Sequence, residues 1–233
     1  MLLNIATCNL WGLPWPLSVD KTKRLRDFIN LIRDYDITAV QELWLNRDIA
    51  YIKKFLPDHN VLAFTKYFNH SGLVYISKMP LFDSKYIPFA QPKEFPSKKG
   101  ILISHIIIDK RKIKLVNTHI ASTKKPLISK NQRSQMKTLI ATLDNQPTLL
   151  FGDFNIDYYN IKLPKKYHLI SFNKHPTRSH TNKYGNKRLN KYLGLDLTCD
   201  LIFANFSVKV LNKKVIYTPL VSDHYPVVTK IQI

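Results

Sequence analysis

Short apolar runs that stop on polar side chains recur along the chain, and their length and β-branched composition are typical of strands. We predict strands over Leu2–Cys8, Ile37–Gln41, Leu73–Ser77, Ile101–Ile108, Ile113–Asn117, Thr148–Phe151, Leu201–Ala204 and Val227–Ile231. Because these runs extend from the first residues to the last, they indicate one unit with a large strand content rather than two separate ones.

A helical period, with apolar residues three and four positions apart, appears in fewer places. It predicts helices over Asp20–Asp34 and Ser129–Leu143, the second with Ser129 as its N-cap. A shorter helix is predicted over Asp48–Phe55, which a proline stops two residues later. There is no internal repeat and no low-complexity linker, so the pattern predicts a single α/β domain over residues 1–233.

The composition excludes several classes of protein. Hydrophobic residues make up 45% of the chain and aromatic residues 12%, which is enough for a packed core and unlike a disordered chain. No apolar run approaches the roughly 20 residues of a membrane-spanning helix. The first seven residues read as a strand and not as a basic leader. We therefore expect a protein that stays in the cytoplasm or is exported without a cleaved signal peptide.

The chain holds two cysteines, Cys8 and Cys199, which are too few for a disulfide framework or a zinc ribbon. We interpret them as reduced thiols in the core, while a single bridge between them stays open. Charge is more informative, because 36 Lys and Arg against 16 Asp and Glu give a net charge of +20. Such an excess attracts polyanions such as nucleic acid or an anionic membrane surface, although lysines that merely decorate solvated faces would produce it as well.

One basic segment, Tyr158–Leu195, contains no acidic residue, and its lysines and arginines alternate with tyrosines and a phenylalanine. This mixture suits phosphates and stacked bases, and it also suits a layer of lipid headgroups. A solvated loop whose tyrosines belong partly to the core is an equal alternative. Within it we select Lys187, Arg188 and Lys191 as candidate substrate-binding residues.

Polar and acidic side chains recur where the predicted strands end or begin. These positions are Asn9, Glu42, Asn117 with His119, Asp153 with Asn155, Asp200, and Asp223 with His224. If the last two strands run antiparallel to the others, all of these side chains lie on one rim of the fold. A single Asp or Asn after a strand is ordinary turn chemistry, but six such positions on one rim indicate a site.

Four carboxylates on one rim repel one another, so a cation is expected to offset them. The oxygens of Asn9, Glu42 and Asp223 are ligands that suit Mg²⁺, with Mn²⁺ as a substitute. Zinc would prefer a tighter cluster of histidine and cysteine. The sequence therefore predicts a magnesium site on this rim.

Taken in order, these motifs resemble those of the endonuclease/exonuclease/phosphatase superfamily of Mg²⁺-dependent phosphoester hydrolases. The matching blocks are Cys8–Gly12, Val40–Glu42, Ser71–Ser77, Asn117–His119, Gln132–Arg133 with Gln135, Gly152–Asn155, Cys199–Phe203 and Ser222–Pro226. Each block is weak alone, but the ordered set covers nearly the whole chain. The resemblance implies a four-layer sandwich in which two packed β-sheets are flanked by helices, with the site at one end.

The resemblance also implies roles for the rim residues. Glu42 would hold the metal with help from Asn9 and Asp223. Asp153 would orient or deprotonate the attacking water, and Asn155 would fix the water or the phosphate.

The histidines would contact the phosphate in this scheme. His224 would touch the scissile phosphate with its imidazole held by Asp200, and His119 beside Asn117 would make a second phosphate contact. This division suits in-line attack on phosphorus, which needs a positioned water and neutralised phosphate oxygens.

The chain departs from parts of the superfamily. Pancreatic-type deoxyribonucleases support the His119-type histidine with an acid, whereas the corresponding stretch Tyr67–His70 offers none. Abasic-site endonucleases have an acid where this chain has Trp11, which puts a second metal ligand at that position in doubt.

Two substrate classes remain. The charge and the basic segment favour nucleic acid as the substrate by a narrow margin. We expect the enzyme to be a monomer. The alternative is a sphingomyelinase-like phospholipid phosphodiesterase, because Asn9–Trp15, Gln41–Trp44 and Ser71–Gly72 look more like neutral sphingomyelinases. Trp11, Trp15 and Trp44 would then face a bilayer. The alternative interpretation is that these tryptophans are ordinary core residues. A non-catalytic polyanion-binding module is the third hypothesis, and intact rim residues disfavour it.

Overall fold

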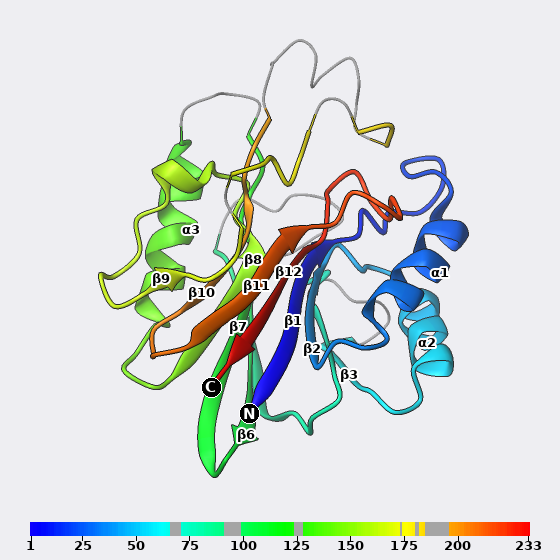
Figure 1. Ribbon diagram of the computed structural model, residues 1–233. Coiled ribbons are helices and arrows are strands. Elements are labelled where there is room, and N and C mark those ends of the chain that lie inside the picture. Colours follow the sequence, from blue (N-terminus) through cyan, green and yellow to red (C-terminus); the bar gives the residue numbers. More distant parts are fainter. Residues whose placement is uncertain (66–70, 91–98, 124–127, 173, 180–181, 185–195) are drawn as a thin grey trace.

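The computed structural model describes residues 1–65, 71–90, 99–123, 128–172, 174–179, 182–184 and 196–233, which form two six-stranded sheets and three α-helices (Figure 1). The first sheet contains, from edge to edge, β11 (Lys209–Val215), β12 (Val227–Gln232), β1 (Leu2–Asn9), β2 (Ile37–Gln41), β4 (Val74–Ser77) and β3 (Asn60–Ala63). The second contains β5 (Phe82–Pro88), β6 (Gly100–Ile108), β7 (Arg111–His119), β8 (Thr148–Asp153), β10 (Asp200–Ala204) and β9 (His168–Leu169).

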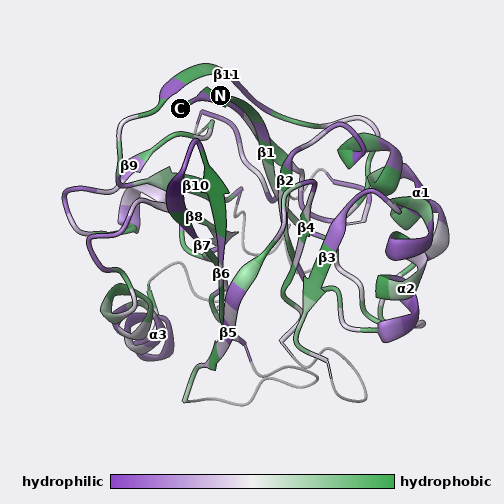
Figure 2. Cartoon of the chain, turned by 90° about the horizontal axis from the view of Figure 1, so that it is seen from below, coloured by the Kyte–Doolittle hydropathy of each residue, from purple (hydrophilic) through white to green (hydrophobic). Residues whose placement is uncertain are grey.

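The helices are α1 (Lys21–Ile32), α2 (Asn46–Phe55) and α3 (Lys130–Ala141), with a 3₁₀ turn, η1, over Tyr158–Asn160. Figure 2 shows α1 and α2 on one side of the pair of sheets and α3 on the other. This arrangement confirms the predicted four-layer α/β sandwich. None of the helices in the described part of the chain is long and apolar enough to cross a membrane.

Three apolar clusters hold the layers together. Between the sheets, residues such as Ile5 and Phe151 pack face to face. Phe28 of α1 packs with Val40 on the outer face of the first sheet. Leu139 of α3 packs in the same way in a cluster on the outer face of the second sheet. The two central strand pairs are therefore covered on both faces, which explains their nearly continuous apolar sequences.

The directions of the strands bring the polar strand ends to one rim. In the first sheet β1 is parallel to β2 and antiparallel to β12, and in the second β7 is parallel to β8 and antiparallel to β10. His119 is therefore level with Asp153, and Asp153 with Asp200. The condition set by the sequence, that the last two strands run against the others, is confirmed.

Sequence patterning predicted eight of the strands and missed β3, β5, β9 and β11. β5 and β11 carry many exposed polar residues, β9 has only two residues, and β3 lies at a sheet edge. Edge strands bury one face at most, so their apolar signal is weak. The N-cap prediction is confirmed, because Ser129 forms a capping box with Gln132. Both cysteines are free and buried, as we interpreted them.

A polar contact crosses the apolar layer between the sheets, just behind the rim. Asn117 of β7 is 0% exposed, and its Oδ1 accepts a hydrogen bond of 2.8 Å from Nε2 of Gln41 in β2. Its Nδ2 donates to the backbone carbonyls of Val40 and Val74, at 3.0 and 3.2 Å. The amide thus fixes the second sheet to the first where the site begins.

The contact between Asn117 and Gln41 predicts that removal of the Asn117 amide destabilises the fold. Asn117→Leu keeps the side-chain volume but leaves the buried amide of Gln41 without this acceptor, so the free energy of unfolding should fall by about 1–3 kcal/mol. Urea denaturation measures it. Thr138→Ala removes an exposed hydroxyl on α3 and serves as the control. A midpoint for Asn117→Leu equal to that of the control would contradict the structural role.

Candidate active site

The carboxylate of Asp153 lies at the end of β8, 1% exposed, and side chains from three other segments converge on it. Its Oδ2 accepts hydrogen bonds from Nδ2 of Asn9 at 2.9 Å and Nδ2 of Asn155 at 3.0 Å, and lies 3.3 Å from Nε2 of His119. Nε2 of His224 is 3.9 Å away. Its other oxygen accepts the backbone N–H of Asn155 at 2.8 Å. One carboxylate therefore organises the ends of four strands.

The partners of Asp153 decide its protonation. Burial acts to raise the pKa of Asp153, but the imidazoles of His224 and His119 and the hydrogen bond from Asn9 outweigh it, and the pKa falls to about 2. Asp153 is therefore an anion at neutral pH although water hardly reaches it.

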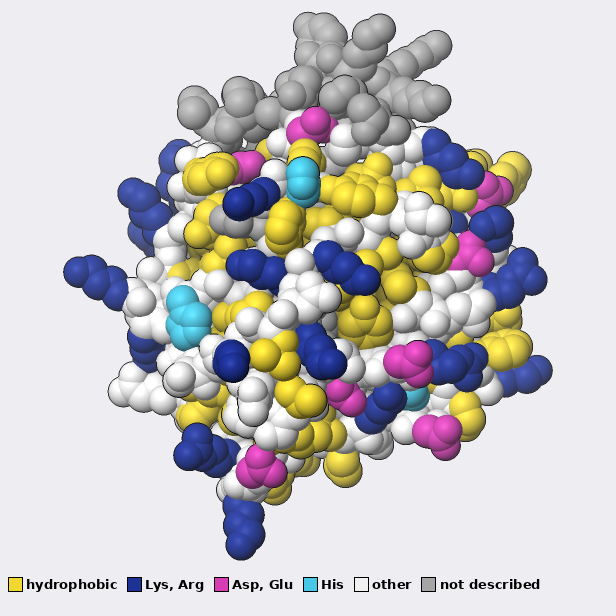
Figure 3. Space-filling view, viewed as in Figure 1, with side chains coloured by type: hydrophobic (Ala, Val, Ile, Leu, Met, Phe, Trp, Pro, Cys, Tyr) yellow, Lys and Arg dark blue, Asp and Glu magenta, His cyan; other side chains and the backbone are white. Residues whose placement is uncertain are grey.

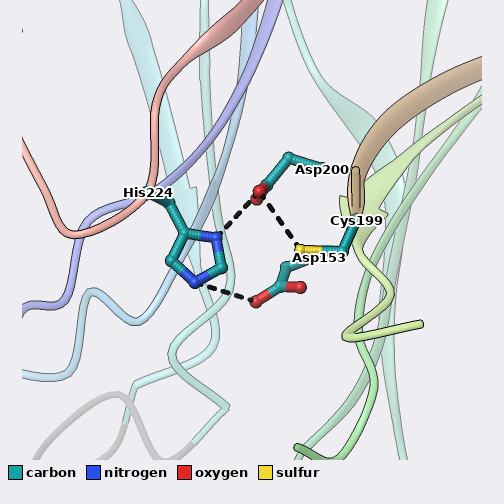
Figure 4. Close-up of side chains that lie close together, drawn as sticks. All are labelled: Asp153, Cys199, Asp200 and His224. Atoms are coloured by element: carbon teal, nitrogen blue, oxygen red, sulfur yellow. Dashed lines mark hydrogen bonds and ion pairs between the residues drawn. The ribbon is translucent and has the colours of Figure 1, made fainter. Parts of the chain in front are cut away.

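A second carboxylate, Asp200, holds the imidazole of His224 (Figure 4). Its Oδ2 lies 2.8 Å from Nδ1 of His224 and accepts a 2.7 Å hydrogen bond from the hydroxyl of Thr177. Burial lowers the pKa of His224, but the charges of Asp200 and Asp153 and the contact with Asp200 raise it well above its ordinary value. Burial raises the pKa of Asp200, which the charge of His224 offsets in part. Asp200, His224 and Asp153 thus form a buried chain of acid, imidazole and acid.

The thiol of Cys199 completes a compact group with these three residues, and the group has the composition of a metal site. The chemistry of the thiol argues against a metal there. Burial raises the pKa of Cys199 well above its usual range, so the sulfur keeps its proton and donates toward Asp200 at 3.6 Å. A thiol is a soft ligand that Mg²⁺ does not favour, and both carboxylates of the group already lie beside the imidazole of His224.

The acids on the open side of the rim fit a hard divalent cation better. Burial raises the pKa of Glu42, and repulsion from Asp223 raises it further. A divalent cation between two such carboxylates relieves both effects, and their oxygens are the ligands that Mg²⁺ accepts. These two residues are therefore the candidates for holding the metal.

Asn9 contacts both Glu42 and Asp153 through its side-chain amide. Its Nδ2 donates to Oε1 of Glu42 at 3.1 Å as well as to Asp153, while its carbonyl oxygen accepts the backbone N–H of Trp11 at 3.0 Å. In this arrangement the amide nitrogen of Asn9 bridges the carboxylates of Glu42 and Asp153 and orients both. Direct coordination by Asn9 stays a prediction.

Three site turns use left-handed backbone, which non-glycine residues seldom adopt. Trp11 has φ of 46°, Glu42 of 59° and Asn155 of 48°. Such conformations cost about 1–3 kcal/mol each for residues other than glycine, and Asn pays least. Each turn follows a strand of the rim and aims a side chain or a backbone N–H at the site, as for Asn155 and Asp153.

His119 differs electrostatically from His224. It is 1% exposed, and burial followed by the charge of Lys99 holds its pKa well below the ordinary value. Its Nε2 also approaches Nδ2 of Asn155 at 3.1 Å and Glu42 at 3.8 Å. Among the described residues no hydrogen-bond partner reaches its buried Nδ1, and Tyr67–His70 lie outside them. His119 is thus a neutral imidazole.

The N-terminal turn of α3 fixes the loops that carry His119 and Asn155. Nε2 of Gln132 donates to the carbonyls of Ala121 and Asn155, at 3.0 and 2.8 Å. Oε1 of Gln135 accepts the backbone N–H of Ala121 at 2.7 Å. The Gln132–Gln135 block of the resemblance therefore positions the site and does not enter it.

Arg24 of α1 fixes site loops in the same way, on the side of the sheets opposite to α3. It is 2% exposed, and its guanidinium donates to the carbonyls of Leu10 and Val221, at 2.7 and 3.1 Å. Further bonds reach the carbonyls of Trp11 and Val19. One buried arginine thus joins the turn after β1 to the loop before Asp223 and His224.

Sequence reasoning missed one site residue, Arg178. Its backbone pairs with that of His224, and its guanidinium donates to Oδ1 of Asn155 at 3.4 Å. Burial acts to lower the pKa of Arg178, but Cys199, Asp223, Asp153 and Glu42 raise it. A guanidinium carries a fork of donors that matches the geometry of a phosphate. The residue lay in the basic segment, where nothing distinguished it from its basic neighbours.

The structure thus brings together most of the predicted site residues. Hydrogen bonds and close polar contacts join Asn9, Glu42, His119, Asp153, Asn155, Asp200 and His224, and Asp223 acts on Glu42 through its charge. Asn117 lies behind the site with both amide hydrogens bonded, which differs from the substrate contact we expected. Lys187, Arg188 and Lys191 lie outside the described residues.

Comparisons with known proteins agree with this geometry. The profile of the Endonuclease/Exonuclease/phosphatase family matches residues 6–224. A putative neutral sphingomyelinase of Drosophila melanogaster is 26% identical over 132 residues, which is 51% of this chain but only 29% of that protein.

Among solved structures, D. rerio TDP2 complexed with single strand DNA product has a TM-score of 0.79 at 16% identity, covering 100% of this chain and 99% of that one. Sphingomyelinase C from Streptomyces griseocarneus has a TM-score of 0.75 at 15% identity, covering 99% of each chain. At these identities the likeness concerns the fold.

The two alternative metal positions predict different binding data. If the cation binds at Glu42 and Asp223, Glu42→Gln should weaken Mn²⁺ binding at least about tenfold, measured by calorimetry on the protein alone. Cys199→Ser, which alters the buried group, should bind as the unaltered protein does. The reverse pattern would place the metal in the buried group.

Proposed function

The chain belongs to the Endonuclease/Exonuclease/phosphatase family and is a phosphoester hydrolase, and from this premise we propose that it uses a divalent metal, Mg²⁺ with Mn²⁺ as a substitute, to cleave phosphodiesters by attack of water on phosphorus. The observation that carries the proposal is the position of Asp153. An anionic carboxylate lies between two histidines and beside the acids that fit a cation.

Asp153 would orient the attacking water. With a pKa of about 2 it is a weak base, so its main contribution is a fixed acceptor that points one lone pair of the water at phosphorus. Asn155 holds this carboxylate through its backbone and its amide. When bound, a divalent cation held by Glu42 and Asp223 would neutralise charge on the phosphate oxygens and make water more acidic.

His224 and Arg178 would donate hydrogen bonds to the phosphate. Asp200 favours the charged imidazole of His224, whose Nε2 faces the Asp153 side of the site. Arg178 adds a permanent charge with a fork of donors. Both stabilise the negative charge that gathers on the phosphate oxygens during attack. His119, which is neutral, would contribute a hydrogen bond without charge.

Nucleic acid is the first candidate substrate. The net charge of +20 supports it, because most of the affinity of proteins for nucleic acid comes from phosphate neutralisation. TDP2, a fold relative, was solved with a DNA product. The proposed contacts of Lys187, Arg188 and Lys191 belong to this candidate.

A phospholipid of the sphingomyelin type is the second candidate, and a specific observation favours it. The sequence relative is described as a putative neutral sphingomyelinase, and Trp15 near the site is 82% exposed. Of the three tryptophans, Trp44 is buried, which agrees with the alternative interpretation as a core residue, whereas Trp15 is exposed.

The catalytic proposal predicts a loss of turnover without a loss of fold. Asp153→Asn and His224→Ala should each lower kcat by about 100- to 10,000-fold, and EDTA should abolish activity until Mg²⁺ or Mn²⁺ is restored. The assays are cleavage of supercoiled plasmid and single-stranded RNA, and phosphocholine release from sphingomyelin vesicles.

Asp109→Asn, at an exposed acid in the turn between β6 and β7, is the control and should keep full activity. The substrate that is cleaved in a variant-sensitive way identifies the class. Cleavage that survives Asp153→Asn, or proceeds fully in chelator, would refute the mechanism.

The proposed phosphate contact of Arg178 predicts a specific pattern of kcat/KM among variants. Arg178→Ala should lower kcat/KM by about 100-fold, and Arg178→Lys should recover only part of it, because lysine keeps the charge but loses the fork. Arg111→Ala, an exposed arginine at the start of β7, is the matched control. Equal rates for Arg178→Ala and the control would remove Arg178 from the phosphate site.

A further inference from the structure

The loop between β1 and α1, residues 13–20, presents apolar side chains to solvent. Trp15 is 82% exposed, Leu17 55% and Val19 47%. Large apolar side chains gathered on one exposed loop mark an interaction surface rather than ordinary surface composition. We propose that this tryptophan loop docks the protein onto the surface of an anionic phospholipid bilayer.

The loop is a built element of the fold. The N–H of Leu17 donates to the carbonyl of Pro14 at 2.9 Å, and the hydroxyl of Ser18 donates to the carbonyl of Leu13 at 2.6 Å. Nε of the buried Arg24 donates to the carbonyl of Val19 at 2.9 Å. These bonds turn the chain so that Trp15 and Leu17 face outward. A fixed loop loses little conformational entropy when it binds.

The surroundings of the loop carry the complementary charge. Arg26 on the adjacent helix and Lys183 are exposed, and Lys183 lies over the ring of Tyr184, 4.7 Å from its centroid. Tyr184 contacts Trp11 and donates its hydroxyl to Asp20, which places this basic residue beside the tryptophan loop.

In Figure 3, hydrophobic side chains lie beside Lys or Arg side chains at the upper right, where Figure 1 draws the loop. The net charge of the chain is +20. An interfacial tryptophan next to cations is the combination that binds anionic bilayers.

The loop and the site share one end of the molecule. The loop starts directly after the turn in which Asn9 accepts the N–H of Trp11, and Arg24 joins that turn to the loop of Asp223. A bilayer that receives Trp15 would therefore lie close to the rim of the site. The inference goes beyond the proposed function, since docking does not depend on which phosphodiester is cleaved.

Vesicle sedimentation tests this proposal. The full chain should pellet with phosphatidylcholine vesicles that contain phosphatidylserine, and less with phosphatidylcholine alone. Trp15→Ser with Leu17→Ser should lower the partition coefficient roughly tenfold or more. The control, Ile107→Ser, removes an apolar residue that is 61% exposed and lies at the end of β6 away from the site. It should leave the partition coefficient unchanged.

Two further readouts keep folding and catalysis separate from docking. Tryptophan emission should shift to the blue when vesicles are added, and Trp15→Phe should abolish the shift while most of the binding persists. Hydrolysis of the soluble diester bis(p-nitrophenyl) phosphate should be equal in the loop variants and the unaltered protein, so its failure would concern the proposed function alone. Unchanged sedimentation of the double variant, or a defect seen only with RNA or DNA, would overturn membrane docking.

Discussion

The burial of the Asp153 carboxylate is the constraint on which the rest of the structure depends. A carboxylate that is 1% exposed loses nearly all of its hydration, and this loss must be offset by charges and hydrogen-bond donors. The donors are the amides of Asn9 and Asn155, the neutral imidazole of His119 lies 3.3 Å away, and the positive group is His224. Asn9, His119 and His224 are far from Asp153 in sequence, so the charge can be buried only when the strand ends meet.

Much of the polar framework can be understood as support for that meeting. Asn117 fixes the two sheets to each other just behind the site, Gln132 holds the loop of Asn155, and Arg24 joins the turn after β1 to the loop before Asp223. The left-handed turn at Glu42 is strained locally, and strain of this kind persists only where the surroundings fix the backbone. Hydrogen bonds therefore hold the site residues in place without a substrate, which favours catalysis by positioning.

The sequence was sufficient for eight of the twelve strands and for the rim, because apolar runs that end on Asn, Glu or Asp have a clear pattern, and the resemblance implied the layers. The sequence was not sufficient for roles that depend on where a side chain points in the folded protein. Asn117 looks like a substrate contact in the sequence, yet hydrogen bonds turn it toward the other sheet. The amide nitrogen of Asn9 bonds to two carboxylates, which the sequence does not reveal, and its role as a metal ligand stays a prediction. Arg178 was one cation among several, and only tertiary pairing beside His224 distinguishes it. Likewise nothing local separates the buried Trp44 from the exposed Trp15.

The central claim is that this rim directs water at phosphorus, and isotope labelling tests it most directly. The reaction would be run in ¹⁸O-labelled water with Mg²⁺ on the substrate that the assays identify, and the products analysed by mass spectrometry. The account predicts one labelled oxygen in the phosphate-bearing product and none in the released alcohol. Label in the alcohol, or a phosphate product without label, would contradict the role assigned to Asp153 and its partners.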